Sequence, residues 1–332
     1  MTIPSTAQNE AESPTLRRGT GVVLRDPLPR HQLVQVVQTA EETGYSSVFV
    51  PEIAAREAFA TLASLGSATS RIRLGTGVVT VQARSPVTTA MGAATLQELS
   101  AGRFVLGLGA GTAPNPLRAV EEYAGVVRAL LSGQMVTHER LGISDFALGL
   151  PLERPPQIWL AALGDRMISL GGRIADGVLL NWCTPERVAR AREMINTSAT
   201  EAGRTPSDVT VAVYVRSCLG VEDGVAYEAL RAAAAQYAAI PHYAKQLVQM
   251  GLGEESRIAA RALESGRLVE VPDRLVRGLT VMGGRRDALA RFDAYRRAGA
   301  DLVLCYPVPA LDPFSSILGT VLAAAPSPAL ER

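Results

Sequence analysis

The residues best suited to binding chemistry lie where predicted strands end. The segment from Ala161 to Asp165 (AALGD) joins a buried strand to a helix through small residues. Free backbone N–H groups and the positive end of a helix dipole at such a turn can bind an anion or a phosphate. An ordinary turn with Asp165 as the helix N-cap explains the same pattern equally well. We refer to this candidate site as the anion cradle, which comprises Ala161, Ala162, Leu163 and Gly164.

Three further residues end the next predicted strand along the chain. Asn181, Trp182 and Cys183 follow the run GVLL. Because the carboxyl ends of parallel strands share one edge, we expect these residues to lie beside the anion cradle. Trp182 is either a core residue or a pocket wall. Cys183 is more simply explained as a small apolar filler than as a nucleophile, because no histidine lies near it in the sequence to activate it.

A glycine-rich segment, Gly107 to Thr112 (GLGAGT), follows another buried run. It partly matches the dinucleotide-binding fingerprint, but threonine occupies the third glycine position and no acidic residue ends a strand about twenty residues later. A nicotinamide site of that type is therefore disfavoured. The glycines either permit close packing of a helix on a strand or let a flat ring lie against the backbone. Just beyond them, Asn115 is either an N-cap or a ligand contact.

Few other side chains offer acid–base or covalent chemistry. Glu52 directly follows a buried strand, so it is either a helix-start charge or a polar group in the mouth of a barrel. His242 and Tyr243 fall in a long helical region, where they either form part of a lid or, as we expect, lie on a solvated face. Lys245, the only lysine, lies in the same region, which disfavours a lyase that forms a Schiff base. The three histidines are too far apart for metal-ligand spacing, so no metal is expected.

The elements that would position these residues alternate regularly between strand and helix. In the segment from Arg71 to Gly111, a strand that contains Gly75 and Gly77 is followed by a helix and then by a second strand. Two parallel strands joined by one helix form a right-handed βαβ unit. The predicted strands of the whole chain are 19–24, 47–51, 72–79, 103–109, 157–162, 177–180, 209–219 and 302–306. This pattern predicts a single-domain α/β fold, a (β/α)8 TIM-type barrel with insertions, with a doubly wound sheet as the alternative.

The barrel is expected over residues 19–325, after a flexible N-terminal tail over residues 1–18. Two segments break the alternation and are expected to be insertions. The first, near 134–156, combines prolines with weak strand-like stretches and suggests a small hairpin. The second, near 221–266, is helical by composition, and its breaks at Pro241 and Gly251 predict two or three helices. Its alanine run, 231–239, could support a homodimer.

Composition limits the class of protein and its partners. Apolar residues make up 47% of the 332 residues, which is enough for a large core. The formal net charge of +1 argues against a nucleic-acid partner and against a polybasic membrane anchor. The sequence contains no uninterrupted run of about 18 apolar residues, so no transmembrane span is predicted. Three distant cysteines suit a reducing cytoplasm better than a disulfide framework, so we expect a cytoplasmic protein that acts on a small molecule.

Three stretches of the chain together resemble one family. They are Arg71–Gly111, Pro155–Trp182 and Ala294–Pro307. They are similar to the luciferase-like monooxygenase superfamily, and specifically to its shorter members that use coenzyme F420, a deazaflavin, in place of FMN. The similarity covers about Gly19 to Pro307. It implies a TIM-type barrel with insertions and a deazaflavin bound at the carboxyl mouth of the barrel.

The resemblance also implies a set of cofactor-binding residues. In relatives, the third strand ends in a bulge, often with a non-prolyl cis peptide bond, that supports the ring; this corresponds to Thr76, Gly77 and Val78. The phosphate site of the family corresponds to the anion cradle. The implied cofactor-binding residues are Glu52, Thr76, Gly77, Val78, Gly109, Asn115, Ala161, Ala162, Leu163, Gly164, Asn181 and Trp182.

The substrate pocket is expected to include Ile53, Thr112, Cys183 and Tyr306. Many relatives have a histidine at the position of Ile53, and some that oxidise sugar phosphates have a glutamate at the position of Thr112. Threonine cannot carry out that proton transfer, so the sugar-phosphate activity is disfavoured. No catalytic residue is assigned, and the candidates for a proton donor are Glu52, Tyr306 and water.

The leading hypothesis is an oxidoreductase that transfers a hydride between F420 and an unidentified small organic substrate. An FMN-dependent monooxygenase of the same fold, which activates oxygen, is the main alternative. A barrel that binds flavin without catalysis is a further one. Only the deazaflavin carries an oligoglutamate tail, and Arg56, Arg84 and Arg166 are either contacts for that tail or solvated charges.

Overall fold

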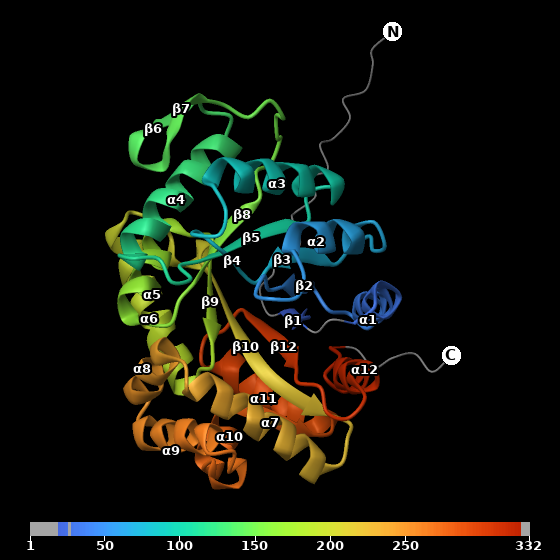
Figure 1. Cartoon of the computed structure of the whole chain (residues 1–332). Helices are drawn as coiled ribbons and strands as arrows, with labels where there is room; N and C mark the ends of the chain where they lie inside the picture. Colours follow the sequence, from blue (N-terminus) through green and yellow to red (C-terminus); the bar gives the residue numbers. More distant parts are fainter. Residues whose placement is uncertain (1–18, 26–27, 327–332) are drawn as a thin grey trace.

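The computed structural model describes residues 19–25 and 28–326. In it, eight parallel strands form a closed barrel with helices around it (Figure 1). The predicted (β/α)8 barrel is therefore confirmed, and the doubly wound sheet is wrong. The tail expected over residues 1–18 lies outside the described residues. The barrel strands are β1 (Gly19–Val23), β2 (Ser47–Val50), β3 (Arg73–Thr76), β5 (Phe104–Gly109), β8 (Gln157–Ala161), β9 (Gly177–Asn181), β10 (Thr210–Leu219) and β12 (Leu302–Pro307).

The barrel closes because β10 pairs with β9 as well as with β12, and β12 pairs with β1, all in parallel. The expected third strand is interrupted. β3 ends at Thr76, Gly77 and Val78 lie outside any strand, and β4 (Val79–Thr80) follows and pairs with β5. β10 is ten residues long, and its first half pairs with β9 whereas its second half pairs with β11 (Thr280–Gly283). The sequence analysis did not predict β11. The long β10 therefore extends beyond β9 toward the inserted helices.

Helices cover the outside of the barrel and fill the second insertion. The helices that alternate with barrel strands, together with the closing one, are α1 (Arg30–Glu42), α2 (Ala58–Gly66), α3 (Pro86–Leu99), α4 (Pro116–Leu131), α5 (Asp165–Ile174), α6 (Pro185–Glu201), α11 (Arg285–Arg297) and α12 (Pro313–Ala323). The inserted ones are α7 (Asp223–Ala238), α8 (Pro241–Gln249), α9 (Gly253–Glu264) and α10 (Asp273–Leu279). Short 3-10 helices are η1 (Glu139–Leu141), η2 (Pro206–Asp208) and η3 (Leu268–Glu270).

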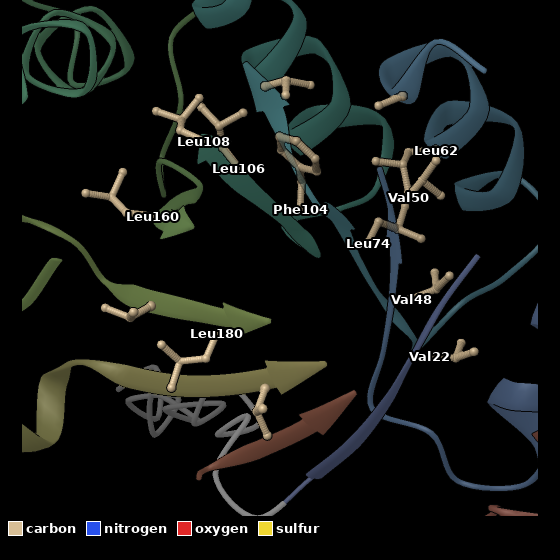
Figure 2. Packing of buried hydrophobic residues seen from close by; sticks show 14 of the residues in the cluster. Val22, Val48, Val50, Leu62, Leu74, Phe104, Leu106, Leu108, Leu160 and Leu180 are labelled. Atoms are coloured by element: carbon tan, nitrogen blue, oxygen red, sulfur yellow. The ribbon is translucent and has the colours of Figure 1, made fainter. Parts of the chain in front are cut away.

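Hydrophobic residues pack in two layers on either side of the barrel wall. Strand residues that face outward contact the helices, as Phe104, Leu106 and Leu108 do in Figure 2. Residues that face inward form a separate cluster, which includes Phe49 and Trp159. The interior is thus filled with side chains, as in other TIM barrels. This leaves the carboxyl ends of the strands as the place for a site.

The two expected insertions have regular structure. The first contains an antiparallel hairpin of β6 (Val136–His138) and β7 (Ile143–Phe146). The second forms three helices, α7 to α9, which group with α10 beside the end of the barrel (Figure 1). In the alanine run, Ala234, Ala235 and Ala238 are buried in a hydrophobic cluster of this same chain. Among the described helices, none combines the length and apolar character needed to cross a membrane.

Candidate active site

The carboxyl ends of the barrel strands surround a floor of two tyrosines. Tyr214 of β10 and Tyr306 of β12 point inward and belong to the interior cluster. Their rings meet edge to face, with centroids 5.8 Å apart. The Tyr214 hydroxyl donates a hydrogen bond to the carbonyl oxygen of Gly77 at 3.2 Å, across the mouth. Burial raises the pKa of Tyr214, so its phenol stays protonated at neutral pH.

Small and apolar groups from three parts of the sheet form one wall of the mouth. Val78 and Ala161 lie half-buried above the interior cluster. A Cβ atom at Gly109 would lie 2.6 Å from Cγ2 of Val78 and 3.8 Å from Cβ of Ala161, so the three residues meet. We call this surface the ring wall. The peptide bond between Gly77 and Val78 is cis, at the position where the family resemblance implied one.

Thr76 supports the ring wall from behind. It is fully buried, and its hydroxyl donates to the carbonyl oxygen of Gly107 and accepts from the N–H of Gly107, both at 2.8 Å. These bonds join β3 to β5 where the ladder between them is interrupted. Thr76 has no exposed surface in the mouth, so any contribution to a ligand is indirect.

The anion cradle has the form expected of a phosphate site. Gly164 is the N-cap residue of α5, with φ −89° and ψ 156°, and no side chain caps the helix start. The first N–H groups of a helix have no partner within the helix. No atom lies within 4 Å of the position that a Cβ at Gly164 would take, so the space in front of the helix is open. Asp165 is the first helical residue, which corrects the alternative in which Asp165 is the N-cap.

Two arginines neutralise the carboxylate of Asp165 beside the cradle. Arg187, whose side chain is 4% exposed, donates from Nη1 to Oδ1 of Asp165 at 2.6 Å and from Nη2 to the carbonyl oxygen of Leu163 at 2.7 Å. Arg190 contacts the other carboxylate oxygen at 2.9 Å. Burial acts to raise the pKa of Asp165, but the two arginines outweigh it and hold the pKa below its usual range. Asp165 therefore does not leave an unbalanced negative charge at the cradle.

Replacing Asp165 by asparagine is expected to lower the free energy of unfolding at pH 7 by about 2 kcal/mol, because Arg187 would remain buried without a carboxylate. Because the pKa of Asp165 is lower in the folded protein than in the unfolded chain, the ionised carboxylate stabilises the fold above about pH 4. This contribution is lost as the pH falls through the lowered pKa. Urea unfolding between pH 3 and pH 7 should show that the difference in free energy of unfolding between the original protein and the variant becomes smaller as the pH falls. Asp223→Asn, an exposed first-turn carboxylate of α7, is the control. A difference that is constant with pH would contradict the assignment.

The end of β9 lies beside the cradle but is largely covered. Trp182 is 3% exposed and stacks on Tyr237 at a centroid distance of 4.8 Å, in a cluster with the inserted helices. Cys183 is 1% exposed, and burial raises the pKa of its thiol to about 12. The structure does not bring Cys183 to the mouth, because its side chain is directed into the core. Asn181 is half-buried and stays in the mouth.

A polar network that the sequence analysis missed surrounds Asn181. Arg216 of β10, which is 3% exposed, donates from Nη1 to Oδ1 of Asn181 at 2.9 Å. The Asn181 amide in turn donates to the Tyr243 hydroxyl at 2.7 Å. Gln246 binds the carbonyl oxygens of Asn181 and Trp182, at 2.8 and 2.7 Å. The expectation that Tyr243 faces solvent is therefore wrong: α8 docks on the end of β9, and of the pair only His242 is exposed.

Glu52 is engaged in structural contacts. Its Oε2 atom accepts hydrogen bonds from the N–H of Ala58 and from Nη1 of Arg84, both at 3.0 Å. The same guanidinium contacts Glu57 at 2.6 Å and lies over the ring of Phe59. Glu52 thus acts as an acceptor at the start of α2, which supports the helix-start interpretation and disfavours it as a proton donor. Arg84 is correspondingly occupied by two carboxylates rather than available for a ligand.

The remaining predicted residues are mostly on the rim. Ile53 is 60% exposed. Thr112 is exposed and accepts a hydrogen bond from Gln82 at 2.8 Å. Asn115 is exposed and occupies the N-cap position of α4, as one of its two alternatives predicted, in a left-handed conformation with φ 53° and ψ 59°; its side chain makes no capping hydrogen bond. Arg56 donates to the carbonyl oxygen of Leu28, whereas Arg166 is exposed on α5.

Comparisons of the sequence agree with this architecture. Residues 12–302 match the family model described as luciferase-like monooxygenase. The chain is 30% identical over 221 residues to a 5,10-methylenetetrahydromethanopterin reductase of Methanolobus tindarius, a match that covers 63% of this chain and 66% of that protein. It is 26% identical over 314 residues to a proposed coenzyme F420-dependent oxidoreductase of Mycobacterium tuberculosis, covering 83% and 90% of the two chains.

Solved structures share the whole fold. The coenzyme F420-dependent tetrahydromethanopterin reductase from Methanopyrus kandleri superposes with a TM-score of 0.81 at 20% identity, over 93% of this chain and 99% of that one. The monooxygenase RslO1 from Streptomyces bottropensis superposes with a TM-score of 0.67 at 22% identity, over 92% and 97%. Because the family model spans most of the chain, the chain belongs to the luciferase-like monooxygenase family of oxidoreductases.

Proposed function

We propose that this protein binds coenzyme F420 at the carboxyl mouth of the barrel and transfers a hydride between it and a small organic substrate. The observation that carries the proposal is the uncapped start of α5, which faces open space at Gly164. The flat ring wall lies on the neighbouring strands, so one site offers both a phosphate position and a ring position. The named activities of the relatives, an F420-dependent oxidoreductase among them, support the choice of coenzyme.

The residues of the mouth fit such a group. The N–H groups at the start of α5 would hold the phosphate, where the helix dipole favours negative charge. Val78 and Ala161 would lie against one face of the ring, because the glycine at 109 lets the side chain of Val78 pack directly against β5. When bound, the coenzyme supplies a hydride donor or acceptor, which no amino acid side chain can provide. The chain itself orients the reactants and excludes water.

The proton that accompanies hydride transfer does not have an assigned donor. Glu52 accepts hydrogen bonds from Arg84 and Ala58, so it is disfavoured. Burial raises the pKa of Tyr243, so this phenol is protonated at neutral pH and close to the mouth. Tyr306 lies 5% exposed on the floor. We propose that a tyrosine or a water molecule held by this set, rather than a carboxylate, supplies the proton.

The test is a side-by-side titration of the purified protein with F420 and with FMN, in which tryptophan fluorescence reports binding. Trp182 lies at the end of β9, and Trp159 lies in the interior cluster two residues before Ala161. Micromolar binding of F420 with weak or absent binding of FMN is the expected result. Preference for FMN would support an oxygen-using monooxygenase, the activity class named for one structural neighbour. Binding of neither by folded protein would contradict the proposal.

A further inference from the structure

Arg216 is a buried cation whose charge is not balanced by a carboxylate from the residues that the structure describes. Among the described residues, only two arginines are buried, Arg187 and Arg216. Arg187 has the carboxylate of Asp165 as its partner at 2.6 Å. Within the same part of the chain, no ion pair joins Arg216 to an aspartate or glutamate. A guanidinium remains charged at all ordinary pH values, so its burial calls for an anion or for compensating contacts.

Aromatic rings supply part of that compensation. The guanidinium carbon lies 3.6 Å from the centroid of Tyr306, 4.9 Å from that of Trp182 and 5.0 Å from that of Tyr237. Contacts of this kind stabilise a cation by about 0.5 to 2 kcal/mol each. They act on the face of the guanidinium, however, and leave the N–H donors at its edge to be satisfied separately.

One edge of the guanidinium is satisfied and the other is not. Nη1 donates to Asn181, whose amide is itself bonded to Tyr243. Nη2 is buried and has no hydrogen-bond partner. Asn181 and Tyr237, which contact the guanidinium, and Tyr243, which is bonded to Asn181, are themselves only half-buried. A buried N–H donor without an acceptor costs about 1 to 3 kcal/mol, and more on a charged group.

We infer that Arg216 binds a carboxylate of the substrate, through its unpartnered Nη2 edge. A carboxylate accepts hydrogen bonds in the plane of a guanidinium and balances its charge. The flat aromatic surroundings suit a planar organic acid better than a strongly hydrated phosphate. This inference rests on the proposed function, because it names the substrate class for that site. It assigns the anion cradle to the coenzyme and Arg216 to the substrate.

The register of β10 links Arg216 to the ring wall. Residues two apart on a strand face the same side, so Arg216 follows Tyr214 on the inward face. The hydroxyl of Tyr214 reaches the carbonyl oxygen of Gly77, next to Val78. A small acid anchored at Arg216 would therefore extend over the tyrosine floor toward the ring wall, where the proposed hydride transfer takes place.

The test uses matched probes on the protein without coenzyme. Benzoate and benzamide have the same shape and differ in charge, and Trp182, in contact with Arg216, is a nearby fluorescent reporter. We expect benzoate to change the tryptophan fluorescence and raise the melting temperature at constant ionic strength, and benzamide to do neither. Arg216→Gln should weaken benzoate binding at least about tenfold. Arg216→Lys, which keeps the charge, should retain the preference for benzoate at lower affinity.

Controls separate this inference from the proposed function. Arg231→Gln on α7, an arginine that is paired with Glu228, should leave benzoate binding unchanged. Equal binding of benzamide, preference for inorganic phosphate, or unchanged benzoate binding in folded Arg216→Gln would overturn the inference. Where F420 binds, saturating F420 should not displace benzoate; displacement would assign Arg216 to the coenzyme instead. Failure of F420 to bind, with benzoate binding intact, would contradict only the proposed function.

Discussion

Gly107→Ala is expected to lower the free energy of unfolding by about 3 kcal/mol, the largest effect on stability that we predict for a single methyl group. A Cβ atom at this position would lie 2.0 Å from the backbone carbonyl oxygen of Thr76. Backbone atoms cannot move aside as the end of a side chain can, so β3 and β5 would have to separate. The hydrogen bonds between Thr76 and Gly107 would be weakened at the same time. Urea denaturation measures the change.

Gly125→Ala is the matched control for this prediction. Gly125 lies on the exposed side of α4, and a Cβ atom there would have no neighbour within 4 Å. Alanine favours the helix over glycine by about 0.5 to 1 kcal/mol, so the same substitution should stabilise the protein here. Opposite signs for the two variants are the expected outcome. A destabilisation below about 1 kcal/mol for Gly107→Ala would show that the two strands are not held as closely as described.

The sequence was informative about the barrel because most of its strands are continuous apolar runs with glycine or proline near their ends. Runs such as GVLL before Asn181 and LVLCYP at β12 need no tertiary information to be recognised as buried strands. β11 was missed because Thr280–Gly283 contains only two consecutive apolar residues, Val281 and Met282, and lies between two helices. Its strand character comes from pairing with the extended part of β10, which is a tertiary effect.

The parts of the candidate site formed by residues adjacent in the sequence could be predicted. The parts formed where distant segments meet were missed. Gly164 was recognisable because a helix start and its preceding residues are contiguous. Tyr243 was placed on a solvated face because nothing near it in the sequence indicates that its hydroxyl meets Asn181. Arg216 left one signal, a charged residue on the inward register of an apolar strand, two residues after Tyr214. Its significance depends on the fact that no carboxylate of the described residues pairs with it, which only the fold can show.

Gly164→Asp is expected to weaken F420 binding by roughly 100-fold or more while leaving the protein folded. The new carboxylate would point into the open space in front of α5, where the phosphate is proposed to lie. Two like charges about 4 Å apart repel by about 4 kcal/mol at the effective dielectric constant of a protein surface. Unlike Asp165, which Arg187 and Arg190 neutralise, the added group would have no arginine dedicated to it. Fluorescence titration with F420 measures the loss.

The same substitution should act on stability in the opposite direction, and this separates binding from folding. Gly164 has the extended conformation of an N-cap residue, and aspartate there can accept the N–H groups at the start of α5, so unfolding should become harder by a few tenths of a kcal/mol. Gly164→Asn has the same shape without the charge and should lose far less affinity. Equal losses for both variants would point to steric blocking, and unchanged affinity in Gly164→Asp would place the phosphate elsewhere. Only a charge-dependent loss in a protein at least as stable as the original supports a phosphate at this helix.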